Sequence, residues 1–126
     1  MNKCMMISLC AFTVALMPAM STFAATSKVS GVTLTQLKAA SANFGECTIR
    51  VNKDINTDGT AALECPNSVV VSLGCDGGFH SKSAANNMFT TAQMALVLGK
   101  TVTIWINDAK QYNESVCTAE SVIYSP

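Results

Sequence analysis

Apolar residues recur at every second position in several stretches of this chain, and such alternation predicts strands with one buried face. Residue types that favour strands, above all valine, isoleucine and threonine, are frequent in the same stretches. Gly31 is expected to make an irregularity in the first strand, and the β-branched run at 69–73 indicates more complete burial. The principal strands are predicted over 29–37, 46–52, 69–73, 101–107 and 116–124.

Turns and irregular stretches separate these strands. Asn, Asp and Gly at 56–59 predict a tight turn, and a short alternation over 61–65 predicts its return strand. A second turn is predicted at 76–78. Residues 39–44 and the polar stretch 107–115 are expected to be loops.

One amphipathic helix is predicted over 82–98. Ser81 or Ser83 can cap its N-terminus. Gly99 stands where a left-handed C-terminal cap belongs, and Lys100 follows near the negative end of the helix dipole. Apolar residues recur three and four positions apart, which indicates one buried face. The members of this stripe are Ala85, Met88, Phe89, Ala92, Ala95 and Leu96.

The order of the principal segments is three β segments, one helix and two β segments. That order matches the OB-fold, a five-stranded Greek-key barrel. We therefore predict a β-rich (α+β) fold, an OB-like five-stranded barrel with one helix between strands 3 and 4 and two disulfides. A small helix-backed sheet of another topology is the alternative.

The first 24 residues have the three-part layout of a secretory signal peptide. Lys3 gives a positive start, an apolar run follows, and Thr22-Phe23-Ala24 places small residues at the two positions that a signal peptidase recognises. The apolar run has about 12 residues, whereas a membrane span needs about 20. We therefore predict a signal peptide over 1–24, a single domain over 25–126, no membrane span and a secreted or periplasmic location.

Removal of this leader leaves four cysteines, Cys47, Cys65, Cys75 and Cys117. An even number in a small exported chain indicates two disulfides. Three pairings are possible. We favour Cys47–Cys65, which would join neighbouring strands, and Cys75–Cys117, which would tie the middle of the chain to its last strand. The competing interpretation is a zinc site, but its cysteines usually come in pairs two to four residues apart, and no such pair exists here.

Charge and motif content bear on the class of function. The mature chain has a net charge close to −1 and no basic patch, which argues against nucleic acid or an anionic membrane as partner. His80 is the single histidine, and neither a free thiol nor a nucleophile-elbow motif accompanies it. We expect His80 to be a solvated surface residue, and we predict a non-enzymatic protein without a cofactor.

The segment that leads to Gly59 copies the first half of a calcium-binding loop. Asp54, Asn56 and Asp58 offer oxygen ligands at alternate positions. The twelfth position of such a loop should be a bidentate Glu, but Cys65 stands there. Because the same residue types favour ordinary hairpin turns, a turn is the preferred interpretation and calcium the weaker candidate.

Trp105, the single tryptophan, is the strongest candidate for ligand binding. Because Ile104 and Ile106 point the opposite way, its indole shares a face with Thr103 and Asn107. An aromatic ring beside hydroxyl and amide groups suits stacking on a sugar ring while the polar groups bind its hydroxyls. A tryptophan packed against the helix or a neighbouring subunit is the alternative.

Two apolar residues, Met94 and Leu98, lie on the side of the predicted helix away from the main stripe. Exposed apolar residues at a helix end can mark a partner surface. Isolated apolar residues are also normal on any protein surface, so both interpretations stay open.

The run from Phe89 to Ile106 contains Ala92-Gln93-Met94-Ala95 and then Gly-Lys-Thr-Val-Thr-Ile. With the leader, the size and the strand order, this run resembles the B subunits of bacterial AB toxins of the subtilase-cytotoxin and typhoid-toxin type. The resemblance implies an OB-like barrel, a pentameric ring and binding of host-cell glycans, often sialylated. No sugar-contacting residue of that family is carried over, because none matches a motif here.

These observations lead to two functional hypotheses. The first is a secreted, carbohydrate-binding domain like a toxin B subunit, with a glycan as ligand and a homo-oligomer, such as a pentamer, or a partner toxin subunit. The second is a periplasmic protein–protein interaction or inhibitor-like structural domain. A glycan-array signal with a pentameric mass favours the first, and capture of one periplasmic protein by a monomer favours the second.

Overall fold

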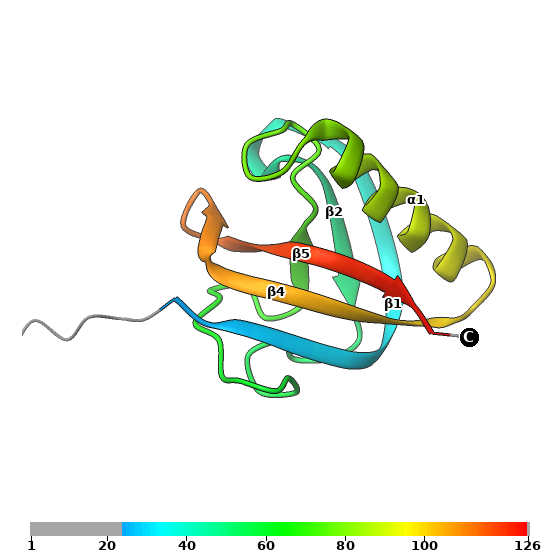
Figure 1. The fold of residues 1–126 in the computed structure, drawn as a ribbon, viewed down its shortest axis with the longest axis horizontal. Helices are drawn as coiled ribbons and strands as arrows, with labels where there is room; N and C mark the ends of the chain where they lie inside the picture. The colour runs from blue at the N-terminus through cyan, green and yellow to red at the C-terminus, as the bar shows by residue number, and fades with distance from the viewer. Residues whose placement is uncertain (1–23, 126) are drawn as a thin grey trace, which may run out of the picture.

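The structure is a computed structural model that describes residues 24–125. It is a closed barrel with strand order β1-β2-β3-β5-β4 and one helix between β3 and β4, which confirms the predicted OB-like fold (Figure 1). Of the leader predicted over 1–24, all but Ala24 lies outside the described residues. The elements are β1 (Thr26–Ser41), a short 3-10 helix (Ala42–Phe44), β2 (Glu46–Val51), β3 (Val70–Ser72), α1 (Lys82–Val97), β4 (Thr101–Tyr112) and β5 (Val116–Tyr124).

Strand β1 is long enough to pair with two neighbours, and this double pairing helps to close the barrel. Its first half pairs antiparallel with β4 and its second half with β2. The register shifts between Val29 and Val32, which confirms the irregularity expected at Gly31. Strand β4 pairs antiparallel with β5, and a parallel bridge between Ser72 and Thr118 joins β3 to β5.

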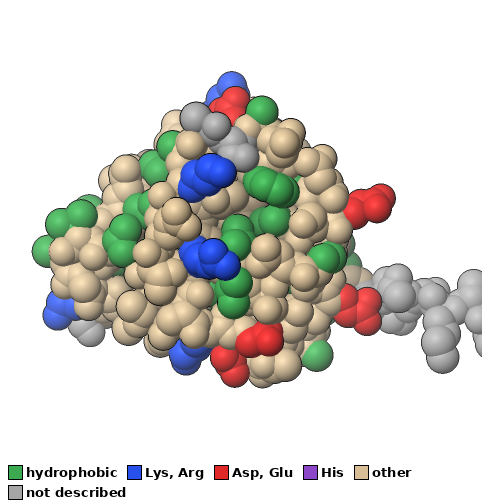
Figure 2. Space-filling model, turned by 180° about the vertical axis from the view of Figure 1, so that it is seen from behind, with side chains coloured by type: hydrophobic (Ala, Val, Ile, Leu, Met, Phe, Trp, Pro, Cys, Tyr) green, Lys and Arg blue, Asp and Glu red, His purple; other side chains and the backbone are tan. Residues whose placement is uncertain are grey.

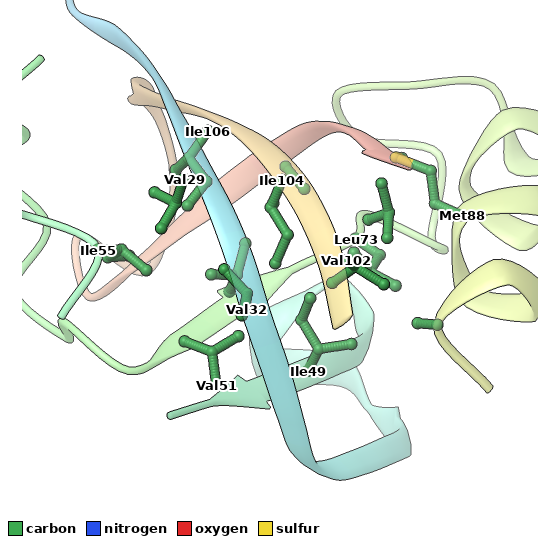
Figure 3. Packing of buried hydrophobic residues seen from close by; sticks show 14 of the residues in the cluster. Val29, Val32, Ile49, Val51, Ile55, Leu73, Met88, Val102, Ile104 and Ile106 are labelled. Atoms are coloured by element: carbon green, nitrogen blue, oxygen red, sulfur yellow. The ribbon is translucent and has the colours of Figure 1, made fainter. Parts of the chain in front are cut away.

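The inward-facing residues of the strands fill the barrel with branched aliphatic side chains. Figure 3 shows Ile55 at one end of this cluster and Met88 of α1 at the other, with side chains of β1, β2 and β4 between them. Ile55 belongs to the connection between β2 and β3 and is fully buried. Because full burial of such a side chain contributes about 1.5–3 kcal/mol, this cluster is the main source of stability.

Helix α1 has the ends and the face that were predicted. The Ser81 side chain accepts a hydrogen bond from the Ala84 N–H, so Ser81 is the N-cap. At the other end the Lys100 N–H donates to the Ala95 carbonyl across Gly99, as in a Schellman cap. Four members of the apolar stripe are buried and two are partly buried against the core.

Three local expectations were wrong. Strand β1 continues to Ser41, so only 42–44 of the loop predicted at 39–44 is outside it. Strand β4 continues to Tyr112 after a register shift, so most of the loop predicted at 107–115 is strand. The segment 61–65 is irregular, because the side chain of Asn56 takes over the hydrogen bonds of the Cys65 backbone that a ladder would provide.

Two disulfides are present, as predicted, but their pairing differs from the expected one. Cys47 is bonded to Cys75, and Cys65 is bonded to Cys117. Cys47 lies beside the chain that leaves β3, since the Leu73 N–H donates to the Cys47 carbonyl. This neighbour relation brings Cys75 to Cys47, whereas 61–65 crosses to β5 and does not return along β2.

Candidate functional site

Trp105 lies in the middle of β4, on the outer surface of the barrel. Its neighbours Ile104 and Ile106 are fully buried, whereas Trp105 is 37% exposed. Cross-strand pairing places Lys28 of β1 on one side of Trp105 and Ser121 of β5 on the other. Figure 1 shows these three strands, β1, β4 and β5, side by side.

The three residues predicted for ligand binding lie on one surface. Thr103 and Asn107 flank Trp105 two positions away on the same strand, and both are partly exposed. Thr103 lies opposite Ile123 of β5, which is exposed. We call this surface the Trp105 face. It consists of Lys28, Thr103, Trp105, Asn107, Glu120, Ser121 and Ile123.

A cation stands next to the indole ring. The Nζ atom of Lys28 is 5.8 Å from the centre of the Trp105 ring, within the range of a cation–π interaction. The Lys28 N–H also donates to the hydroxyl of Thr60, so the backbone that carries this side chain is itself anchored. Among the described residues, the indole N–H of Trp105 has no hydrogen-bond partner, and it is free to donate to a ligand.

Next to the ring, Asn107 belongs to a network of charged and polar groups. Its Nδ2 atom donates to Oε1 of Glu120 over 3.1 Å, and the same carboxylate forms an ion pair with Lys110 at 2.8 Å. The bond from Lys110 lowers the pKa of Glu120, although burial acts in the other direction. Glu120 is therefore ionised at neutral pH, and its carboxylate is held in place.

Sequence reasoning found the strand positions of this face and missed their neighbours. Lys28 and Glu120 reach Trp105 and Asn107 from other strands, and only the register of β1 and β5 against β4 brings them there. Lys110 lies in a stretch that was expected to be a loop. No local pattern signals these three residues.

A second polar cluster lies where the connection after β3 meets the end of β4. The hydroxyl of Tyr112 donates to Oδ1 of Asp76, which also accepts from the Gly78 N–H at 2.9 Å. The ring of Phe79 packs edge-on against Tyr112. Asn113, just after β4, donates to the carbonyl of Asn43, so this cluster joins three loops and is a structural junction.

His80 is partly buried rather than solvated, in contrast to the expectation. Its Nε2 atom lies 2.7 Å from the carbonyl oxygen of Ala119, so that nitrogen donates to the backbone of β5. This bond fixes the loop ahead of α1 against the barrel. In this tautomer the proton is on Nε2 and the lone pair is on Nδ1.

The calcium candidates take part in hydrogen bonds within their own loop. Asp54 accepts from the Asn56 N–H at 2.9 Å, and Asp58 accepts from the Asp54 N–H at 3.1 Å. The amide of Asn56 is bonded twice to the Cys65 backbone. These bonds are those of a turn, the interpretation that the sequence favours, and calcium remains the weaker alternative.

Residues 24–125 contain no group of three or more His, Cys, Asp or Glu side chains arranged to hold a metal ion. Within the same residues, no helix has the length and apolar character to cross a membrane.

Hollows in the surface occur away from the Trp105 face. One of about 430 Å³ lies at the start of β1, and one of about 540 Å³ lies between β1, β2 and α1 beside the Cys47–Cys75 bond. A shallower apolar one lies at the C-terminal end of α1.

Comparisons of the chain with protein-family models, with curated proteins and with solved structures found no match.

Proposed function

We propose that this protein is an exported, non-enzymatic domain that binds carbohydrate through the Trp105 face. The observation that carries the proposal is a partly exposed indole, fixed in a β-strand and surrounded by polar side chains that are themselves held in place. The resemblance of the chain to toxin B subunits points to the same class of ligand.

The chemistry of the face suits a sugar. An indole ring offers an apolar surface to the C–H groups of a pyranose, and the adjacent polar groups can exchange hydrogen bonds with its hydroxyls. Glu120 accepts, while Thr103 and Ser121 both donate and accept. Because Lys110 and Asn107 already orient the carboxylate, a ligand meets an ordered acceptor and loses less conformational entropy on binding.

The same geometry does not favour hydrolysis of the sugar. Glycosidases use two carboxyl groups, one on each side of the scissile bond, and one of them acts as an acid with a raised pKa. Glu120 is paired with Lys110, and its pKa is lowered by that partner. A carboxylate in this state suits binding of hydroxyl groups better than proton donation.

The test is a glycan array followed by calorimetric titration of the best ligand. Trp105→Ala should lower the affinity about tenfold or more, because it removes the stacking surface. Trp105→Phe keeps a ring and should retain part of the binding. Asn87→Ala is the control, since Asn87 is an exposed residue of α1 outside the Trp105 face and should bind as the parent does.

Circular dichroism of each variant must first show an unchanged fold. If Trp105→Ala binds as tightly as the parent protein, the site is wrong. If the parent protein binds no glycan, the proposed ligand class is wrong.

A second candidate function, assembly with further copies of the chain, rests on an apolar patch at the C-terminal end of α1. Met94, Val97 and Leu98 are 57%, 84% and 56% exposed, and Tyr124 lines a hollow beside them. Figure 2 shows hydrophobic side chains gathered at this end of the molecule, at the left of the view. The resemblance to ring-forming B subunits favours another copy of this chain as the occupant.

Analytical ultracentrifugation tests this second candidate. The parent protein should sediment as an oligomer at micromolar concentration, and Val97→Asp should sediment as a monomer because a charge replaces the most exposed member of the patch. Lys100→Glu, a charge change next to the patch, is the control. A parent protein that is monomeric even at high concentration contradicts assembly.

A further inference from the structure

Asp108 holds the backbone at the very start of the barrel. The N–H of Ala25 donates to Oδ1 of Asp108 over 2.7 Å, and the Asp108 N–H donates in return to the Ala25 carbonyl over 3.1 Å. The second carboxylate oxygen accepts from the Glu64 N–H at 3.3 Å. One side chain therefore connects the residue before β1, the strand β4 and the connection that carries Cys65.

The predicted signal-peptide cleavage point coincides with this contact. The leader pattern ends in Thr22-Phe23-Ala24, so cleavage would separate Ala24 from Ala25. Ala24 is exposed, whereas Ala25 packs partly against the core and β1 begins at the next residue. The nitrogen that cleavage would release is thus the same nitrogen that Asp108 binds.

We propose that hydrolysis after Ala24 turns the Ala25 nitrogen into an α-ammonium group that forms an ion pair with Asp108 and fixes the start of β1. The inference rests on the export that is part of the proposed function, but not on glycan binding. A signal peptidase and water are the co-reactants. Water splits the C–N bond. Its hydroxyl joins the Ala24 carbonyl carbon to give a carboxylic acid, and its other hydrogen goes to the Ala25 nitrogen. The proton of the acid passes to the same nitrogen, which leaves a carboxylate on Ala24 and –NH₃⁺ on Ala25.

The surroundings of Asp108 suit a cation. The hollow of about 430 Å³ at this point contains two acidic residues, Asp108 and Glu64. No lysine or arginine is among the described residues that line it. Among residues 24–125, the Asp108 carboxylate accepts only from the backbone N–H groups of Ala25 and Glu64, whereas the cut chain supplies a positive charge in contact with it. The lining residues are Ala24, Ala25, Ala62, Glu64, Asp108, Ala109 and Gln111.

The geometry already matches the product. A separation of 2.7 Å is typical of a bond between an ammonium nitrogen and a carboxylate oxygen. Before cleavage the donor of this bond is a neutral amide, and after cleavage it carries a positive charge opposite the carboxylate, which adds a Coulomb attraction. The bond from Asp108 to the Ala25 carbonyl keeps the new terminus from fraying, so the pair forms without a rearrangement of β1. Cleavage therefore strengthens an existing contact.

The first measurement is the mass of the full chain after export by a bacterial host. A mature chain that begins at Ala25 supports the proposal. A chain that begins elsewhere, or that keeps its leader, overturns it. Neither result depends on whether the protein binds a glycan, and the glycan array decides that question separately.

The second measurement is a thermal-unfolding cycle of four proteins. Two begin at Ala25, with Asp108 or with Asp108→Asn, and two carry residues 20–24 ahead of Ala25, so that its nitrogen remains an amide. With Asp108, the mature chain should melt about 4 °C above the extended chain. With Asp108→Asn, which retains an acceptor but no charge, the two N-termini should melt together. The difference in melting temperature between the two N-termini should therefore be larger with Asp108 than with Asp108→Asn. If the two differences are equal, Asp108 is only a neutral strand cap, and the ion pair is overturned.

If Asp108→Asn does not fold, the titration of the Ala25 amine in the parent mature protein decides. Methylation of that amine with a ¹³C label makes its protonation visible by NMR. An ion pair predicts a pKa above the range of about 7.7–8.0 that is usual for an α-amino group. A value within or below that range overturns the pair.

Discussion

Tyr112 joins the end of β4 to the connection between β3 and α1 through a hydrogen bond and an aromatic contact. Its hydroxyl donates to Asp76, and its ring centre is 5.0 Å from that of Phe79. Burial and then the bond to Asp76 raise the pKa of Tyr112. Burial also acts to raise the pKa of Asp76, but the bonds from Tyr112 and Gly78 outweigh it and the pKa is lowered. The pair is therefore a neutral phenol bound to a carboxylate at neutral pH.

Tyr112→Phe should lower the free energy of unfolding by about 1–2 kcal/mol near neutral pH, because it removes a hydrogen bond to a charged group and keeps the ring. The loss should shrink in acid. Asp76 has a lowered pKa when folded, so its contribution is present above its unfolded pKa, near 3.8, and is lost as the pH falls through the folded value. Urea unfolding of both proteins at about pH 7 and about pH 2 measures the change. An equal loss at both pH values contradicts the charged hydrogen bond.

At the residue scale, the chain sequence predicted which way a side chain faces better than what it contacts. The exposure of Trp105 between buried isoleucines follows from alternation, which is a property of one strand. Its contact with Lys28 depends on the register between two strands, and His80 finds its carbonyl partner 39 residues away. Such contacts are set by the closed barrel, so local patterns do not contain them.

At the element scale, the helix was the most predictable part because three independent signals agree on it. The apolar stripe, the Ser81 cap and Gly99 together define a helix that ends within one residue of the predicted position. The ends of the strands were less predictable. Strands β1 and β4 continue through polar residues, because their partners across the barrel supply the backbone hydrogen bonds that local composition does not indicate.

Two glycines have a left-handed backbone conformation: Gly99 follows α1, and Gly45 precedes β2. Substitution of each by alanine measures a different contribution to stability. Gly99, at φ +62°, has no atom within 4 Å of the position that a Cβ would take. Gly99→Ala should therefore cost only the backbone term, about 1 kcal/mol. Gly45, at φ +73°, would place a Cβ 2.5 Å from Cζ of Tyr112 and 2.9 Å from Oγ of Ser72.

Gly45→Ala should consequently cost clearly more than Gly99→Ala, because the same backbone strain is joined by a collision with a packed ring. Urea unfolding of both variants gives the comparison. Equal losses would mean that Tyr112 can move aside at little cost, which contradicts its role as a junction.

At the scale of the whole molecule, strand order and disulfide pairing depend on different information. The order of segments was enough to predict an OB-like barrel, since few closed arrangements accommodate it. The pairing failed because it was inferred from a hairpin in which 61–65 returns beside 46–52. In the structure, β3 takes that place beside β2, and Cys65 is carried to Cys117 on β5.

The observed pairing predicts a specific set of disulfide-linked peptides. Pepsin digestion at about pH 2 prevents exchange, since few thiols are ionised there. Cleavage beside Leu73 separates Cys65 from Cys75, so the fragment with Cys75 should be linked to the one with Cys47. A fragment that links Cys47 to Cys65 would instead restore the pairing expected from the sequence.

Both disulfides should also support the barrel, because each closes a long loop of the unfolded chain. The separations are 52 residues for Cys65–Cys117 and 28 for Cys47–Cys75. Loop entropy predicts losses of about 4 kcal/mol and about 3.5 kcal/mol when each pair is replaced by alanine. Urea unfolding of the two double variants measures these losses. The Cys65–Cys117 bond holds an irregular segment to β5, whereas the Cys47–Cys75 bond lies beside strands that are already paired. Loss of Cys65–Cys117 should therefore destabilise the protein more. A larger loss for Cys47–Cys75 would contradict this expectation.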